Sequence, residues 1–238
     1  MKKAIIIGAT SGIGRGIAKQ LIANHYKVGL SGRRTALLND LKEENPDSCV
    51  IQTFDVTETN TVAEKLEKLT AELGGLDLLI ISAGTGHLND QLDFQLEKLT
   101  IETNVLGFTC VADWAFNYFA HQKFGHLVAI TSVGGLRGGR QAPAYNATKA
   151  FQINYLEALR QKATKLDIPF FITDIRSGFV ATEMAKGKGQ FWVATVEKAS
   201  RQIFNAITAK KKIAYVTKRW VLIATLLKRI PRPFYDRM

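Results

Sequence analysis

Short apolar runs alternate along the chain with longer stretches in which apolar residues recur every three or four positions. The runs are continuously apolar, which is typical of strands buried on both faces of a parallel sheet. They predict strands at residues 4–7, 27–31, 50–54, 77–81, 126–131, 170–174 and 213–216. The periodic stretches predict helices at residues 14–24, 36–44, 59–73, 94–121, 144–166, 196–209 and 219–229.

Repeated strand–helix units of this kind predict an α/β fold with a doubly wound parallel sheet of about seven strands and helices on both faces. A length of 238 residues, 46% of them hydrophobic, suits one large domain. Because the sequence holds no repeat and no Pro/Gly-rich linker, we expect a single domain over residues 1–217. Residues 178–195 contain three glycines and predict a loop of the kind that often covers a substrate.

The net charge of +11 is concentrated at the C-terminus, because residues 210–238 hold nine Lys or Arg and one acid. The remainder of the chain resembles an ordinary soluble enzyme in charge. Cys49 and Cys110 lie in apolar segments without metal-type spacing, so buried thiols in a reducing cytoplasm are expected. Neither the cysteines nor the four histidines form a ligand pattern, and no metal is predicted. No signal peptide and no run of about 20 apolar residues is present, which supports a cytoplasmic location.

A glycine-rich turn follows the first predicted strand, with Gly8, Gly12 and Gly14 ahead of the first helix. Glycines allow the backbone to approach a pyrophosphate closely, and a helix N-terminus offers free N–H groups to phosphate oxygens. In the first strand–helix turn of an α/β chain this pattern predicts dinucleotide binding.

The end of the second predicted strand distinguishes the two nicotinamide dinucleotides. NAD sites usually place an acid there for the ribose 2′-hydroxyl, whereas NADP sites place arginine near the 2′-phosphate. Arg33 and Arg34 follow that strand and no acid does. Since guanidinium groups suit phosphate oxygens, NADP(H) is predicted as the preferred cofactor and NAD(H) as the less favoured one.

Tyr145 and Lys149 are four residues apart and therefore lie on one face of a predicted helix. A phenol has a pKa of about 10 in water, and a nearby positive charge lowers it. Ser132, thirteen residues upstream of Tyr145, could hold the oxygen of a substrate whose proton the tyrosine gives or takes.

These residues together resemble the short-chain dehydrogenase/reductase family, in its single-domain NADP(H)-preferring branch, from residue 3 to about residue 216. Further matching segments are Asp55-Val56, the run from Ile81 to Gly84, Asn104, and the run from Arg176 to Thr182. The resemblance implies a single-domain Rossmann fold. It also implies a set of cofactor-binding residues: Gly8, Thr10, Ser11, Gly12, Ile13, Gly14, Arg33, Arg34, Asp55, Val56, Ala83, Gly84, Asn104, Tyr145, Lys149, Gly178, Val180 and Thr182.

The resemblance assigns catalytic roles to four residues. Tyr145 would be the general acid/base, and Lys149 would lower its pKa and hold the nicotinamide ribose. Ser132 would orient the substrate carbonyl or alcohol, and Asn104 would keep a water in a proton relay beside Lys149. Hydride would pass between the nicotinamide and the substrate carbon.

Two positions depart from the family pattern, since Ser82 replaces an asparagine and Ser177 replaces a proline. The loss of the proline removes a fixed φ before Gly178 and restores an N–H. We expect a modest effect on the cofactor pocket, because the catalytic set is unchanged.

The C-terminal segment 218–238 combines an apolar helix, residues 220–227, with basic flanks. Such a helix is buried somewhere: on the domain, on a neighbouring subunit, or at an anionic membrane surface as a peripheral contact. The family resemblance implies a homodimer or homotetramer. Nucleic acid is not expected as a partner, because no basic groove interleaved with aromatic residues is evident.

The sequence therefore predicts an NADP(H)-dependent oxidoreductase that acts on a small carbonyl or secondary-alcohol substrate, of carbonyl reductase or alcohol dehydrogenase type. A non-catalytic NADP-binding scaffold or regulator is the alternative. The retained Ser132, Tyr145, Lys149 and Asn104 favour the enzyme.

Overall fold

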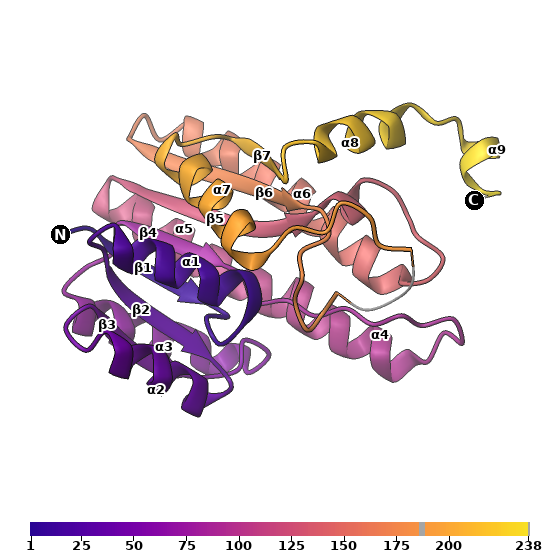
Figure 1. Cartoon of the computed structure of the whole chain (residues 1–238). Coiled ribbons are helices and arrows are strands. Elements are labelled where there is room, and N and C mark those ends of the chain that lie inside the picture. The colour runs from indigo at the N-terminus through magenta and orange to yellow at the C-terminus, as the bar shows by residue number, and fades with distance from the viewer. Residues whose placement is uncertain (186–188, 238) are drawn as a thin grey trace.

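The computed structural model of the chain describes residues 1–185 and 189–237. Its centre is a sheet of seven parallel strands in the order β3-β2-β1-β4-β5-β6-β7 (Figure 1). This confirms the predicted doubly wound sheet. The strands are β1 (Lys3–Ile7), β2 (Lys27–Gly32), β3 (Cys49–Thr53), β4 (Leu78–Ile81), β5 (Gly125–Ser132), β6 (Phe170–Ser177) and β7 (Ile213–Val216).

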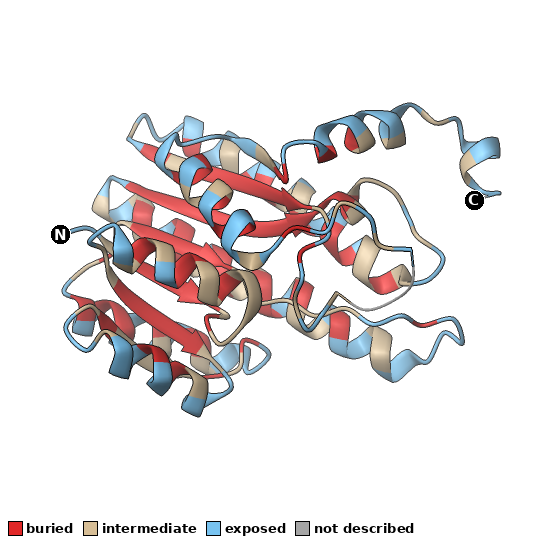
Figure 2. Ribbon diagram, in the orientation of Figure 1, coloured by how far each residue is buried: buried red, intermediate tan, exposed pale blue. Residues whose placement is uncertain are grey.

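Helices cover both faces of the sheet. One face carries α1 (Gly12–Ala23), α2 (Thr35–Glu44) and α7 (Val196–Thr208), and the other carries α3 (Thr59–Leu73), α5 (Phe108–Gln122) and α6 (Pro143–Thr164). In β1, Ile5 and Ile7 pack in the core beneath α3, α5 and α6, whereas Ala4 and Ile6 pack in the core beneath α1, α2 and α7. Both faces of the strand are therefore buried, which is why it is apolar at every position (Figure 2).

The predicted helix over residues 94–121 is not one regular helix. It comprises α4 (Phe94–Ile101), a π-helical turn η1 (Glu102–Gly107) and then α5. Apolar periodicity continues through the turn, so the sequence pattern does not reveal it. Such turns widen the helix locally and occur often at functional sites. Here the turn carries Asn104.

A short 3₁₀ turn, η2 (Val133–Leu136), follows β5 and leads towards α6. The predicted loop over residues 178–195 returns across the end of the sheet, where Val180 pairs with Ala194 in a parallel bridge. Its residues 186–188 lie outside the described part of the chain.

The C-terminal segment forms α8 (Trp220–Arg229) and a second helix, α9 (Arg232–Tyr235), which was not predicted. Both extend past the carboxyl end of the sheet (Figure 1). Arg137 attaches them to the domain, because its Nη1 donates to the carbonyl oxygens of Leu227 at 3.0 Å and Ile230 at 2.9 Å. Within the described residues, no helix is both long and apolar enough to cross a membrane.

Candidate active site

A cleft of about 1810 Å³ opens at the carboxyl ends of the strands. This exceeds the range of roughly 300–1,000 Å³ for typical ligand pockets, so it has room for more than one ligand. Of the predicted site residues, eighteen line it: Gly8, Thr10, Ser11, Gly12, Ile13, Gly14, Arg33, Arg34, Asp55, Val56, Ala83, Gly84, Ser132, Tyr145, Lys149, Gly178, Val180 and Thr182. Asn104 is the exception and lies fully buried behind the cleft wall.

The glycine turn is a tight cradle in which side chains would not fit. A Cβ at Gly14 would lie 2.0 Å from the Gly8 carbonyl oxygen, and one at Gly8 would lie 2.6 Å from the Ala83 nitrogen. Gly12 has φ +53°, and a Cβ there would be 3.0 Å from Cγ2 of Thr182. Because these glycines have no side chains, the backbone N–H groups at the N-terminus of α1 are open to the cleft. This arrangement binds phosphate groups.

Arg34 reaches over this turn. Its Nη2 donates to Oγ1 of Thr10 at 3.1 Å and to Oγ of Ser11 at 2.6 Å, and its Nη1 pairs with Glu183 at 3.2 Å. Arg33 is 74% exposed and pairs with Asp55 at 3.5 Å. Two guanidinium groups thus border the part of the cleft beside the end of β2, where they suit an additional phosphate.

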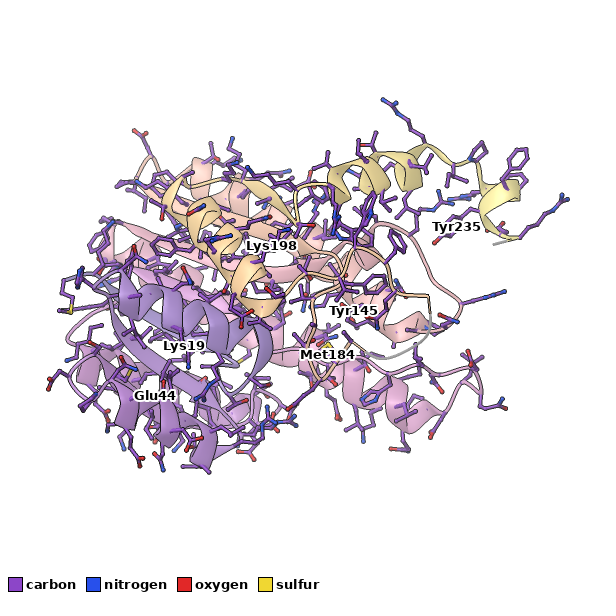
Figure 3. All side chains as sticks on the ribbon, in the orientation of Figure 1. Lys19, Glu44, Tyr145, Met184, Lys198 and Tyr235 are labelled. Atoms are coloured by element: carbon purple, nitrogen blue, oxygen red, sulfur yellow. The ribbon has the colours of Figure 1, made fainter. Side chains whose placement is uncertain are left out.

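Ser132 and Tyr145 meet on the opposite side of the cleft. Gly134 lies against both, since a Cβ there would be 3.4 Å from Oγ of Ser132 and 3.6 Å from Cε1 of Tyr145. The Ser132 hydroxyl accepts a hydrogen bond from the Gly134 N–H at 3.0 Å and donates to the Ser177 carbonyl at 3.3 Å. These bonds fix the hydroxyl beside the phenol. Tyr145 is labelled in Figure 3.

Lys149 is held deeper, by two acceptors. Its Nζ donates to the Ile130 carbonyl at 3.0 Å and to Oε1 of Gln152 at 2.9 Å. The Gln152 amide in turn donates from Nε2 to the backbone carbonyl of Asn104 at 2.9 Å. The lysine, the glutamine and the π-helical turn therefore form one buried chain of hydrogen bonds.

The Asn104 side chain fixes the loop that follows β4. Its Oδ1 accepts from the Thr85 N–H at 2.9 Å, and its Nδ2 donates to the Thr85 carbonyl at 2.7 Å and to Oγ1 of Thr148 at 3.1 Å. This loop passes close to the catalytic tyrosine candidate, because a Cβ at Gly86 would lie 2.4 Å from Cδ2 of Tyr145. Asn104 thus positions the backbone that packs on Tyr145.

The pKa of Tyr145 is raised in the structure, whereas the sequence predicted that it would be lowered. Burial raises the pKa of the phenol, and the hydrogen bond with Ser132 opposes this effect only in part. Burial outweighs any lowering by Lys149, whose ammonium donates to Ile130 and Gln152 and lies 5.8 Å from the tyrosine ring centroid. Burial lowers the pKa of Lys149 to about 8, against the attraction of Asp174.

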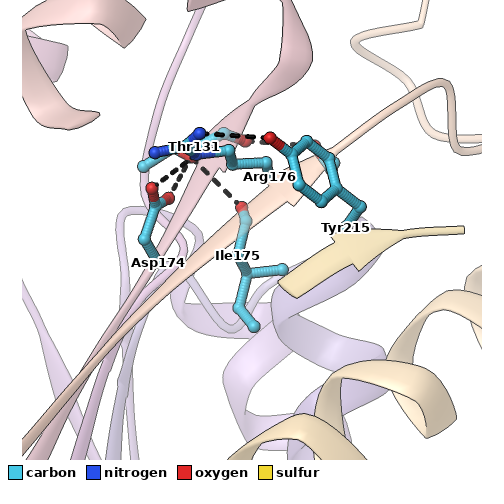
Figure 4. Close-up of polar contacts among 6 residues, drawn as sticks. Thr131, Asp174, Ile175, Arg176 and Tyr215 are labelled. Carbon is cyan, nitrogen blue, oxygen red and sulfur yellow. Dashed lines mark hydrogen bonds and ion pairs between the residues drawn. The ribbon is translucent and has the colours of Figure 1, made fainter. Parts of the chain in front are cut away.

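Asp174 belongs to a buried polar cluster beside the site (Figure 4). Its carboxylate pairs with Nε of Arg176 at 2.7 Å and accepts from the Thr131 hydroxyl at 2.5 Å. Arg176 Nη1 also donates to the Tyr215 hydroxyl at 3.2 Å, which ties β6 to β7. Burial lowers the pKa of Arg176, but Asp174 and Tyr215 more than offset it, so the guanidinium stays charged.

The departure at position 177 is accommodated by a side-chain hydrogen bond, because the Ser177 hydroxyl donates to the Thr131 carbonyl at 3.1 Å. At position 82 the backbone N–H donates to the Ile7 carbonyl at 2.8 Å, a bond that does not depend on the side chain. The Ser82 hydroxyl lies next to the glycine cradle, 3.2 Å from the position of a Cβ on Gly14.

Sequence reasoning missed Gln152 and Gly86. Gln152 is three residues after Lys149 on the same helix, and that spacing places both side chains on one face. The signal for Gln152 was therefore present. The requirement for glycine at position 86 depends on how closely a loop approaches α6, which no local pattern reports.

Comparisons with known proteins show the family to which the chain belongs. A family model described as short chain dehydrogenase matches residues 2–191. The chain belongs to the short-chain dehydrogenase family. An uncharacterized oxidoreductase of Myxococcus xanthus is 34% identical over 188 residues, which cover 77% of this chain and 74% of the relative.

Two solved structures of this family's fold are similar over most of the chain. A short-chain dehydrogenase from Streptomyces avermitilis aligns with a TM-score of 0.82 at 22% identity, over 95% of this chain and 91% of that one. A serine dehydrogenase in its closed form, complexed with NADP⁺, aligns with a TM-score of 0.79 at 26% identity, over 87% of this chain and 89% of that one. The chain is thus an oxidoreductase of this family. The residues of the cradle would fit a nicotinamide dinucleotide, because they leave backbone N–H groups and arginines around the cleft.

Proposed function

We propose that this short-chain dehydrogenase is an NADP(H)-dependent carbonyl reductase or alcohol dehydrogenase with Tyr145 as its general acid/base. The observation that carries the proposal is that the phosphate cradle and the side chains of Ser132, Tyr145 and Lys149 line one cleft. A bound nicotinamide would supply or accept the hydride. A non-catalytic scaffold would have no need for a phenol, a hydroxyl and an ammonium gathered beside the cofactor cradle.

Each side chain has a distinct task. The Ser132 hydroxyl donates to the substrate oxygen and fixes its distance from the phenol. Tyr145 protonates that oxygen in reduction and removes its proton in oxidation. Lys149 provides the positive charge that favours the phenolate once its ammonium turns towards the cleft, and Asn104 holds the loop against Tyr145.

The replacement Tyr145→Phe tests the catalytic assignment. It removes the exchangeable proton and keeps the ring, so turnover should fall by about 10²–10⁴-fold while NADPH affinity is retained. Turnover is read from NADPH absorbance with a panel of ketones and aldehydes, and affinity from NADPH fluorescence. Unchanged turnover would remove Tyr145 from the mechanism.

We infer that NADP(H) is preferred over NAD(H) because two arginines border the cleft at the end of β2. The NADP⁺ complex of the related serine dehydrogenase is consistent with this preference. Arg33→Ala should weaken NADPH binding about tenfold or more and leave NADH binding nearly unchanged, since only NADPH carries the 2′-phosphate. Arg201→Ala, on the exposed side of α7, is the matched control. An equal loss for both cofactors would reject the arginine argument.

A homodimer or homotetramer is proposed through the faces of η1 and α6. Leu106 is 55% exposed and Phe151 is 36% exposed, and Phe151 stacks on Tyr155 at 5.5 Å between ring centroids. Sedimentation velocity of the full chain should show an oligomer that Phe151→Glu weakens. A monomeric wild-type protein at micromolar concentration would contradict this proposal.

A cytoplasmic location, with peripheral contact of the C-terminal segment at a membrane, remains a proposal. Leu222 is 68% exposed on α8 between basic residues, which is the kind of surface that an anionic bilayer binds. Flotation with phosphatidylserine vesicles, with the wild-type chain and with Leu222→Glu, tests it. Absence of the wild-type chain from the vesicle fraction would exclude the contact.

A further inference from the structure

The cleft continues beyond Tyr145 and is walled there by the C-terminal segment. Five apolar residues of that segment line the same cavity as the catalytic candidates: Trp220, Ile223, Leu226, Leu227 and Ile230. Arg137 holds this wall through two backbone carbonyls, and the Tyr235 hydroxyl donates to the Gly138 carbonyl at 2.6 Å. The Arg137 guanidinium also lies 4.0 Å from the Tyr235 ring centroid. These contacts hold α8 and α9 at the wall of the cleft; Tyr235 is labelled in Figure 3.

The cleft displays apolar surface to solvent. Five apolar side chains that line it are exposed: Leu88, Phe179, Met184, Phe191 and Leu226, at 51%, 37%, 46%, 46% and 56%. Phe179 and Phe191 adjoin the C-terminal wall, since their ring centroids lie 5.5 Å and 5.0 Å from that of Trp220. Apolar side chains clustered in one concave surface mark a binding groove for an apolar ligand. Burial of each methylene of such a ligand would increase affinity about fourfold.

The far end of the cleft is basic. Arg140, Arg232 and Arg237 line it, and Asp236 is the acid beside them. None of the three arginines forms an ion pair within residues 1–185 and 189–237. Guanidinium groups bind carboxylate and phosphate oxygens through paired hydrogen bonds. The outer cleft thus combines an apolar wall with an anion-binding end.

We propose that the substrate is an extended apolar carbonyl compound that ends in a carboxylate or phosphate. The reacting carbonyl lies at Tyr145, the chain lies along the C-terminal wall, and the anionic end meets Arg232 and Arg237. This inference rests on the proposed carbonyl–alcohol function and specifies its substrate class. It also gives the basic charge of the C-terminus a purpose at the active site, whereas a membrane contact would use the outward side of α8.

Kinetics with matched substrates test this proposal. The probes are methyl-keto acids from 5-oxohexanoate to 11-oxododecanoate and the neutral 2-ketones of equal chain length, each with saturating NADPH. The keto acids should exceed the ketones in kcat/KM by about tenfold once the chain is long enough to reach the arginines. Arg232→Gln/Arg237→Gln should remove that advantage through KM and leave the ketones unchanged.

Lys228→Gln/Arg229→Gln is the matched control, because it removes the same charge from exposed residues that do not line the cleft. It should leave the keto acids unaffected. Equal kcat/KM for keto acids and ketones would overturn the proposal. An equal loss in both double variants would also overturn it, since that result indicates general attraction by net charge.

Binding of dodecanoate, followed by quenching of tryptophan fluorescence, separates this site from the reaction. Trp220 lines the cleft and lies 6.0 Å from Trp192 between ring centroids. Quenching that requires Arg232 and Arg237, in a protein that reduces none of the carbonyls, would support the anion-binding cleft and reject the proposed reaction. Turnover of neutral ketones without dodecanoate binding would support the reaction and reject the cleft. Vesicle flotation that requires these arginines, with unchanged keto-acid kinetics, would assign them to a membrane and overturn the proposal.

Discussion

Gln152→Met should shift the pH dependence of the reaction to lower pH. Gln152 is 1% exposed, and its amide joins the Lys149 ammonium to the Asn104 carbonyl with two bonds of 2.9 Å. Methionine has nearly the same length but can form neither of these hydrogen bonds. Of the two acceptors that the ammonium has in the described part of the chain, only the Ile130 carbonyl then remains. The change therefore removes one acceptor from a buried charge with little change in volume.

The magnitude follows from the lost bond. A hydrogen bond to a charged group contributes about 1.5–3 kcal/mol, and 1.36 kcal/mol corresponds to one pKa unit. The pKa of Lys149, which burial has already lowered to about 8, should therefore fall by about one to two further units. If Lys149 must be charged, the alkaline limb of kcat/KM moves down by the same amount. The Asn104 carbonyl also loses its donor, which costs about 1–3 kcal/mol of stability.

The assay is kcat/KM against pH, with NADPH saturating, because this profile reports ionisations of the enzyme form that meets the substrate. Gln152→Glu is the matched variant: its carboxylate attracts the ammonium and should raise the pKa of Lys149, so the alkaline limb moves up. Urea unfolding measures the stability of both variants, Gln152→Met and Gln152→Glu. Opposite shifts identify Gln152 as a positioning residue for Lys149. Profiles that superimpose, with stability lowered alike in both variants, would refute the reasoning and leave Gln152 a packing residue.

Four further outcomes are expected. Gly178→Ala should destabilise the fold by about 1–3 kcal/mol in urea unfolding, because a Cβ there would meet the Trp220 ring at 2.1 Å. Arg137→Gln should speed tryptic cleavage within the C-terminal segment several-fold, because it frees two carbonyls of that segment, while the core unfolds as before. Between pH 8 and 10.5 the free energy of unfolding of the wild-type protein should rise relative to that of Lys149→Met. In this range the lysine binds more protons in the unfolded than in the folded wild type, because its pKa is lowered from 10.5 to about 8 on folding; a difference that does not change with pH would contradict the lowered pKa. Cys49, with a pKa raised to about 11 by burial, should react with iodoacetamide at pH 8 only on unfolding, which mass spectrometry reads.

The sheet could be predicted from the sequence because its inner strands β1, β2, β4, β5 and β6 are buried on both faces and are therefore apolar runs. The π-helical turn at Asn104 could not, since one extra residue in a helical turn leaves the apolar spacing almost unchanged. The consequence is chemical as well as structural. A regular helix would use the Asn104 carbonyl for its own backbone bonds, whereas the π-helical turn allows it to accept from Gln152.

The members of the candidate site were predictable, but their electrostatics were not. The spacing of Tyr145 and Lys149 places the two on one helix face, and a lowered tyrosine pKa was expected from that alone. Burial decides the outcome instead, because it raises the pKa of the phenol and lowers that of the ammonium. Side-chain direction also matters, since the Lys149 ammonium donates to the Ile130 carbonyl and to Gln152 in this arrangement. Neither effect can be read from spacing, because both depend on contacts with distant strands.

The attachment of the C-terminal segment shows why its position was left open by the sequence. A helix C-terminus favours a positive charge near its last carbonyls, and α8 carries Lys228 and Arg229 in its own last turn. Arg137, some 90 residues earlier in the chain, donates to those carbonyls instead. The basic residues of the segment are thus available for other partners. Arg232 and Arg237 line the cleft, whereas Lys228 and Arg229 do not. The last four basic residues of the chain therefore divide into an inner pair and an outer pair, and the two double variants measure the pairs separately.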